Sequence, residues 1–442
     1  MSLIQKNDPK IIKAWTFYDW ANSVFPLVIT SAIFPNYYEY QTSHINGQDV
    51  GDMVTLFGIS FKNQDIYSYV YSFALLIVVC LAPILSGIAD YYGNKKRFLQ
   101  FFCYLGSISC MCLYFFDREM LGLSFIPFIT ATIGFWGSLV FYNSYLPEIA
   151  TEDNQDRVSA RGFALGYFGS SLLLIICLVG IIVFKKDATT GKGFYEVKDS
   201  FLLTGLWWIG FAQLTFRKLP GKVHKAKGPD EKLISKGFNE LKKVWADLKN
   251  RPELKKFLSS YFFYNMGVQT IMVMAVLFAR KEVVWPDEKT KTNSLIVSIL
   301  LIQFLGVAGS FFFSFISKKI GNIKSLTIAI LIWVGICIFT YLVLRLPFHF
   351  YIVAASVGFV MGGIQALSRS TYSKLLPQRD DHTAYFSFYD VMEKLGMILG
   401  TISFGIISQI SGGMRNSVLI LILFFVIGLI LLLRLKQEEV DA

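Results

Sequence analysis

The sequence has few charged residues and few side chains that bind metals. Asp, Glu, Lys and Arg make up 17% of its 442 residues, whereas a soluble domain carries about 25%. There are four histidines and six cysteines, and no two cysteines form a Cys-x-x-Cys pair, so zinc sites and disulfide frameworks are not expected. A nucleotide-binding loop and a hydrolase elbow are also missing. We therefore predict no metal, no cofactor and no ATP-driven chemistry.

Hydrophobic residues take the place of the missing charges. They make up 54% of the chain, and aromatic residues make up 16%. A helix that spans a bilayer needs about 20 mostly apolar residues. We predict an all-α membrane protein with twelve transmembrane helices. The predicted apolar segments are 15–38, 67–89, 98–116, 121–145, 162–184, 201–216, 257–279, 293–316, 326–344, 350–372, 385–408 and 416–434.

The net charge of +11 is concentrated in the loops. Basic loops set the orientation of a membrane protein, so we expect a multi-pass protein of the cell membrane with both termini in the cytoplasm, and no nucleic-acid partner. The loop before residue 257 contains Lys242, Lys243 and Lys249. This loop is either an amphipathic helix on the inner membrane surface, bound to anionic lipid, or a solvated linker. We expect a monomer.

Three short patterns recur in the same order in the two halves of the chain. Such repeats predict two pseudo-symmetric six-helix bundles, with residues 1–216 as the first, 217–256 as a cytoplasmic linker and 257–442 as the second. The matched pairs are Tyr18-x-x-x-Asn22 with Tyr261-x-x-x-Asn265, Gly93-Asn94-x-Lys96 with Gly321-Asn322-x-Lys324, and Tyr142-x-x-x-Leu146-Pro147 with Tyr372-x-x-x-Leu376-Pro377.

A glycine-rich basic motif follows the second predicted span. It closely resembles the cytoplasmic loop motif of the major facilitator superfamily, although Ser86 and Tyr91 depart from that pattern and Lys318 replaces the aspartate in the second half. An aspartate there can reach the N-terminus of a neighbouring helix, where the dipole favours a negative charge. We expect this motif to hold one conformation of a transport cycle. Its residues are Gly87, Asp90, Gly93, Lys95, Lys96 and Arg97.

Three further stretches resemble one particular family within that superfamily. They are similar to the bacterial family related to the autophagy-linked vacuolar amino-acid effluxer, and the similarity extends over the whole chain. This resemblance implies the major facilitator fold and efflux of amino acids. The stretches are 15–23 (WTFYDWANS), 141–148 (FYNSYLPE) and 362–370 (GGIQALSRS).

Polar residues recur within the first, fourth, seventh and tenth spans, which line the central cavity of major facilitators. Because polar groups are costly in hydrocarbon, we expect them to face a cavity or a partner. Arg369 is expected to pair with Glu148 in a closed inner gate, to grip a solute carboxylate in an open one, or only to snorkel to headgroups. The candidates for substrate binding or gating are Asp19, Asn22, Asn143, Glu148, Asn265, Gln269, Gln365 and Arg369.

The eleventh span contains three ionisable residues, Asp390, Glu393 and Lys394. Asp390 and Lys394 are one helical turn apart and can pair. Together with Asp19, the three are candidates for proton coupling. The alternatives are a neutralised cluster that only packs helices and, for Asp19, an acid placed by the helix dipole. In the fifth span, Gly162, Gly166 and Ser170 form a small-residue series typical of close helix packing.

These patterns together predict a secondary active transporter and not an enzyme. We expect it to move a small polar solute, an amino acid or related metabolite, by alternating access with proton coupling. Two alternatives stay open at this point: a membrane-embedded lipid-modifying enzyme, and a non-transporting sensor on a carrier fold.

Overall fold

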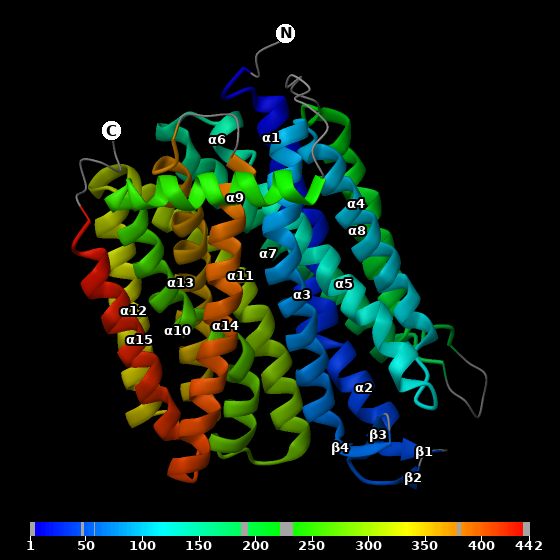
Figure 1. The fold of residues 1–442 in the computed structure, drawn as a ribbon. Coiled ribbons are helices and arrows are strands. Elements are labelled where there is room, and N and C mark those ends of the chain that lie inside the picture. Colours follow the sequence, from blue (N-terminus) through cyan, green and yellow to red (C-terminus); the bar gives the residue numbers. More distant parts are fainter. Residues whose placement is uncertain are drawn as a thin grey trace.

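The computed structural model describes residues 5–45, 48–56, 58–186, 193–221, 233–377 and 382–435. Long helices lie side by side along a common direction (Figure 1). The helices are α1 Pro9–Asn22, η1 Phe25–Ala32, α2 Phe34–Ser43, α3 Asn63–Tyr92, α4 Lys95–Cys112, η2 Leu113–Phe115, α5 Leu121–Asn143, α6 Leu146–Ile149, α7 Glu152–Val183, α8 Asp199–Lys218, α9 Leu233–Lys249, α10 Pro252–Glu282, α11 Glu288–Ile320, α12 Asn322–Leu342, α13 Pro347–Lys374, α14 His382–Ser411, η3 Arg415–Ser417 and α15 Val418–Leu432.

Every predicted apolar segment falls on helical structure. Within the described ranges, ten helices are long and apolar enough to cross a membrane. The other two predicted spans are the first, which is divided among α1, η1 and α2, and the sixth, which is α8. The aromatic and polar residues of α8, including Trp207, Trp208 and Gln213, lower its mean hydropathy. The first predicted span is thus helical but interrupted.

Pro26 explains where the first span is interrupted. A proline inside a helix has no N–H to donate and its ring crowds the preceding turn. Around Pro26 the chain forms a π-helix, η1. The hydroxyl groups of Thr30 and Ser31 donate to the Pro26 carbonyl at 2.9 and 2.7 Å, so this carbonyl keeps hydrogen-bond partners.

The buried apolar side chains form two clusters, one for each half of the chain. The first extends from Ile12 to Leu219. The second contains residues from Val244 to Leu435 together with Tyr167 of α7. A boundary between the halves at residues 217–256 stays a prediction. Helices approach each other closely within the second half: an added Cβ on Gly309 of α11 would lie 1.7 Å from the Phe359 carbonyl oxygen of α13.

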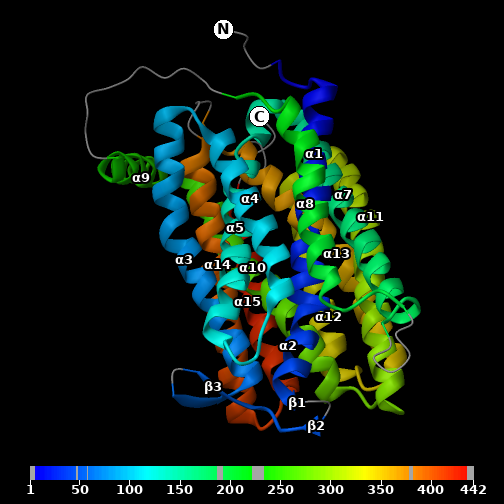
Figure 2. The same cartoon turned by 90° about the vertical axis from the view of Figure 1, so that its right-hand side faces the viewer.

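Two features distinguish the ends of the helix bundle. At one end, α9 lies across the long helices (Figure 1), and beside α3 at the edge of the bundle in the perpendicular view (Figure 2). We call this end the α9 side. At the other end lie two antiparallel hairpins, β1 His44–Ile45 with β2 Gln48–Asp49 and β3 Met53–Leu56 with β4 Ile59–Lys62. We call that end the β side. The first alternative for the loop, an amphipathic helix, agrees with α9.

Candidate functional site

Arg369 of α13 joins the two halves of the molecule. Its side chain is buried, and the hydrogen-bond partners that the described residues give it belong to α1, α5 and α7. Nε donates to Ser159 Oγ and Nη2 to the Ser159 carbonyl, both at 2.9 Å. Nη1 donates to Asn143 Oδ1 at 3.2 Å and to Asp19 Oδ2 at 3.3 Å. One guanidinium therefore connects the C-terminal half to three helices of the N-terminal half.

Asp19 is the negative partner of Arg369 and is held by Tyr142. The Tyr142 hydroxyl donates to Asp19 Oδ2 at 2.7 Å. Aromatic rings enclose the guanidinium, with Cζ 4.2 Å from the Phe163 ring centroid and 4.9 Å from that of Trp15. A buried ion pair is tolerated when its remaining hydrogen-bonding groups find partners. These contacts supply the partners, and we call Asp19, Tyr142, Asn143, Ser159 and Arg369 the Arg369 cluster.

Gly162 of α7 leaves the room that the Arg369 cluster occupies. An added Cβ would lie 2.4 Å from Asp19 Oδ2 and 2.9 Å from Arg369 Nη2. One helical turn later, an added Cβ on Gly166 would lie 2.4 Å from Ser23 Oγ. The small-residue series of the fifth span thus permits close packing of α7 on α1, as predicted, and also makes space for the ion pair.

The predicted pairing of Arg369 with Glu148 is wrong for this structure. Glu148 lies in the short helix α6, where the ammonium of Lys95 contacts its Oε1. Nδ1 of His382 lies 3.8 Å from the same oxygen. Burial raises the pKa of the Glu148 carboxyl, but the Lys95 charge and the contacts with His382 outweigh it and hold the pKa below its usual value. Glu148 pairs with Lys95 because α4 begins beside α6, and Arg369 pairs with Asp19 instead.

Asp90 makes the contact that its motif predicts. Its carboxylate accepts hydrogen bonds from the backbone N–H groups of Thr383, at 3.3 Å, and Ala384, at 2.7 Å. These N–H groups belong to the first turn of α14, where they have no partner inside the helix and where the dipole favours a negative charge. Gly93 ends α3 in the left-handed conformation, with φ of 62°. The end of α3 is therefore fastened to the start of α14.

The other residues of the basic motif have separate places. Gly87 is buried within α3. Lys96 donates to the Leu219 carbonyl at 2.8 Å, which ties the start of α4 to the end of α8. Arg97 is exposed.

A second acid contact, at Asp156 of α7, was missed by the sequence reasoning. Its carboxylate accepts from Asn322 Nδ2 at 2.9 Å and from Ser317 Oγ and Lys374 Nζ, both at 3.0 Å. All three donors come from the C-terminal half. In the internal repeat, the loop that contains Asn322 corresponds to the loop after Asp90. The Asn322 loop has no aspartate at the matching position, and Asp156 of α7 provides the acid instead. The presence of Lys318 at the motif's aspartate position was the signal that could have prompted a search for an acid elsewhere.

In the eleventh span, Asp390 and Lys394 pair as their spacing predicts, and Glu393 also contacts Lys394. Lys394 is fully buried, and its ammonium contacts Asp390 Oδ1 and lies 3.3 Å from Glu393 Oε2. It also lies 3.8 Å from the ring centroid of Trp136 in α5. Gln269 Nε2 of α10 donates to Glu393 Oε1 at 2.9 Å. We call these five residues the α14 cluster.

The remaining predicted residues lie near these clusters without joining them. Gln365 accepts a hydrogen bond of 2.5 Å from Tyr167 of α7, and is thus another link between the halves. Asn265 Oδ1 lies 3.4 Å from Gln269 Nε2. Asn22 is buried beside Ser23, whose hydroxyl lies 3.5 Å from its Oδ1. The Nδ2 groups of Asn22 and Asn265 have no partner among the described residues.

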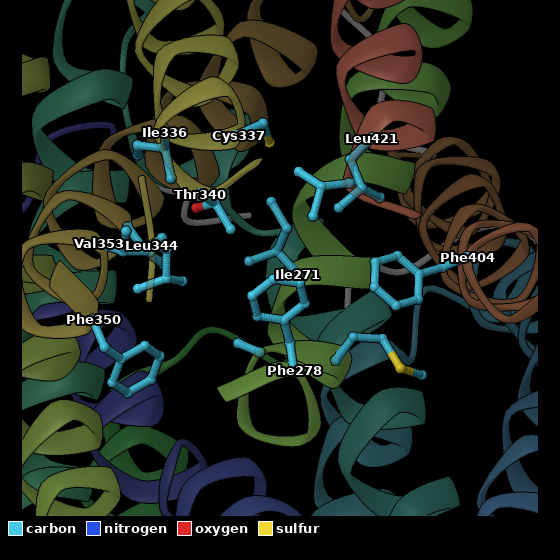
Figure 3. Close-up of a pocket in the computed structure, with 14 residues that line it drawn as sticks. Ile271, Phe278, Ile336, Cys337, Thr340, Leu344, Phe350, Val353, Phe404 and Leu421 are labelled. Atoms are coloured by element: carbon cyan, nitrogen blue, oxygen red, sulfur yellow. The ribbon is translucent and has the colours of Figure 1, made fainter. Parts of the chain in front are cut away.

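A cavity of about 60 Å³ lies in the C-terminal half, away from the charged clusters. Figure 3 shows Ile271, Phe278 and Phe404 around it, with Thr340 as a polar side chain in the wall. Its lining comes from α10, α12, α13, α14 and α15. A wall of this composition does not provide the hydrogen bonds that a polar solute needs. The charged clusters between the halves are therefore the candidate functional site.

Comparison with known proteins places the chain among transporters. A model of the family described as vacuole effluxer Atg22 like matches residues 7–441. An uncharacterized MFS-type transporter of Bacillus subtilis, YxiO, is 30% identical over 98% of this chain and 97% of the relative. Autophagy-related protein 22 of Kluyveromyces lactis is 26% identical over 95% and 92%.

Solved structures show the same fold. The major facilitator FucP in the outward conformation superposes with a TM-score of 0.68 at 14% identity, over 98% of this chain and 99% of that one. The human organic anion transporter MFSD10 gives 0.67 at 10% identity, over 97% and 100%. These likenesses confirm the predicted major facilitator fold.

Proposed function

Because the chain belongs to the family described as vacuole effluxer Atg22 like, a family of major facilitator transporters and not of enzymes, we propose that it moves a small polar solute by alternating access. The solute is an amino acid or related metabolite, and its movement is coupled to protons. The observation that supports this best is the Arg369 cluster, in which a buried cation of one half is bound by three helices of the other.

The contacts between the halves on the α9 side must break when that side opens. Asp90, Asp156 and Arg369 each cross from one half to the other. Breaking a buried pair costs about 3–5 kcal/mol if a charge is left unpaired, so Arg369 needs a replacement for Asp19. A solute carboxylate can provide it through two parallel hydrogen bonds. Recognition of a carboxylate fits an amino acid, the class that the sequence resemblance implies.

The α14 cluster supports proton coupling by its charge balance. Two carboxylates, Asp390 and Glu393, share the ammonium of Lys394. Among the described residues, Lys394 is the cation that contacts both of them. With all three ionised, one negative charge is left over in a buried place. Binding one proton removes this excess. Asp19 differs, because Arg369 balances it and Tyr142 occupies Oδ2. We therefore assign the coupling proton to Asp390 or Glu393.

The proposal also gives the chain an orientation. The α9 side contains the basic loop motif and α9 itself, so by the positive-inside rule we propose that it faces the cytoplasm and that the protein lies in the cell membrane. Both chain ends then lie in the cytoplasm, and one chain holds all of the clusters, which fits a monomer.

Transport by the purified protein in proteoliposomes tests the proposal. Radiolabelled amino acids are offered with and without a pH gradient, and the Arg369→Ala variant is reconstituted in parallel. We expect exchange of at least one amino acid, stimulation by the gradient, and loss of both in the variant. A protein that binds solutes but moves none would be a sensor on a carrier fold, and the proposal would fail.

A further inference from the structure

Helix α9 lies on the outside of the bundle, near the ends of the long helices. It packs against α3 and α14 and runs across them (Figures 1 and 2). The Trp245 ring stacks 6.1 Å from that of Phe388, and the Tyr385 hydroxyl donates to Asp247 at 2.5 Å. Both partners lie in the first two turns of α14. At 1.5 Å per residue this level is within roughly 10 Å of the helix start.

The side chains of α9 divide into two faces. Val244 and Leu248, one helical turn apart, are buried against the bundle. Lys242, Trp245 and Lys249 are exposed and follow a spacing of three and four residues, which places them on one flank. Trp245 is 54% exposed although its ring stacks on that of Phe388. A tryptophan between two lysines is typical of a helix that lies in the interface of a membrane.

We propose that this flank of α9 binds the headgroups of anionic phospholipids, a role beyond the transport function proposed above. Lysines attract an anionic bilayer, and an indole favours the boundary between headgroups and hydrocarbon. Trp245 packs on Phe388, which is further along α14 than Tyr385, so the indole lies on the side of α9 that faces the membrane. A soluble partner would be expected to bind beyond the ends of the long helices, away from the membrane. The lateral position of α9 favours lipid.

Lipid bound to α9 acts on the contact between the two halves. Asp247 of α9 holds Tyr385, and the two preceding residues, Thr383 and Ala384, donate to Asp90 of α3. The Tyr385 carbonyl also accepts from Tyr372 of α13 at 2.6 Å. A lipid that fixes α9 therefore fixes the first turn of α14 where it holds α3, and so stabilises the state in which the α9 side is closed.

An environment-sensitive fluorophore on α9 tests the proposal without knowledge of the solute. We replace Cys80 and Cys112, the exposed cysteines of the described ranges, by serine and label Ala246→Cys, an exposed position of α9. The full-length protein is reconstituted in phosphatidylcholine vesicles with increasing phosphatidylglycerol. We expect the emission to shift to shorter wavelength as phosphatidylglycerol rises, and the shift to reverse in high salt.

Two charge variants make the test specific. Lys242→Gln/Lys249→Gln should reduce the phosphatidylglycerol-dependent partition of α9 by roughly 25-fold, about fivefold per lysine. The control is Lys281→Gln/Lys289→Gln, which removes the same charge from exposed positions on the β side. The proposal would be overturned if the emission did not change with phosphatidylglycerol, or if the two double variants responded equally. Helix α9 would then be a solvated linker or a site for a protein partner.

Discussion

The Arg369 cluster and the α14 cluster are both buried groups of charges that touch both halves, but they balance charge differently. In the Arg369 cluster one cation meets one anion, and the other contacts are neutral donors and acceptors from three helices. In the α14 cluster one cation meets two anions, both on its own helix. The ring of Trp136 and the amide of Gln269 contact these charged residues from other helices.

The difference indicates a division of labour. The Arg369 cluster is held together across the halves, so separating the halves must break it. The three charged residues of the α14 cluster stay together on one helix when the halves separate, and they carry the surplus negative charge. We therefore expect the first to control whether the halves part, and the second to control whether their movement depends on protons.

The largest effect is expected at Arg369. Arg369→Ala leaves Asp19 buried without a positive partner, at a cost of about 3–5 kcal/mol. Arg369→Lys keeps the charge but loses the planar fork that serves Asp19, Asn143 and Ser159 together. Both variants should lose solute exchange in proteoliposomes almost completely. Normal exchange by both would mean that the Arg369 cluster only packs helices and takes no part in transport.

Neutralising the α14 cluster should separate coupling from exchange. Glu393→Gln and Asp390→Asn each remove the surplus charge, so accumulation driven by a pH gradient should disappear while exchange at equal pH persists. The measurement is uptake with and without the gradient. Arg369→Ala is the comparison variant, and we expect it to lose both accumulation and exchange. The idea would be refuted if both single variants still accumulated solute in response to pH.

Gly162→Ala should disturb the Arg369 cluster without removing any polar group. The added methyl group meets Asp19 and Arg369 at distances below 3 Å, and overpacking of this kind costs about 1–3 kcal/mol. We expect a lower melting temperature and slower exchange. The matched control is Gly210→Ala in α8, where an added Cβ meets nothing within 4 Å. Equal behaviour of the two variants would contradict the described geometry.

Glu148 should show the smallest effect, and the effect should disappear at low pH. Because the Lys95 charge holds the pKa of Glu148 below its ordinary value of 4.5, the pair stabilises the folded state above that pH. The stabilisation is lost as the pH falls through the lowered pKa. The difference in melting temperature between the protein and Glu148→Gln should be constant from pH 5 to pH 8. A difference that changes within that range would assign the titration to another group.

Local spacing in the sequence was enough to predict the Asp390–Lys394 pair and the contact of Asp90 with a helix N-terminus. Asp19, Asn143 and Arg369 were recognised individually as polar residues in apolar spans. Their meeting could not be predicted, because Arg369 and Asp19 are 350 positions apart and depend on how the two halves pack. For the same reason Glu148 was assigned the wrong partner.

Residues without an unusual local pattern escaped the sequence reasoning. Ser159 and Asp156 lie in the first turns of α7, where a hydroxyl and an acid attract no notice, since acids are common at helix N-termini. Their role appears only when α7 packs against α11 and α13. The break of the first span at Pro26 could have been predicted from the proline alone, because proline interrupts a helix.

The central claim is that the Arg369 cluster keeps the two halves together on the α9 side, and a distance measurement tests it most directly. Spin labels are placed at Arg97→Cys in α4 and Lys324→Cys in α12, exposed positions of opposite halves, with Cys80 and Cys112 replaced by serine. Double electron–electron resonance is then recorded for this protein and for its Arg369→Ala and Asp19→Asn variants without solute. We expect a single distance distribution in the unmodified protein and a longer mean distance in both variants. An unchanged distance in both variants would contradict it.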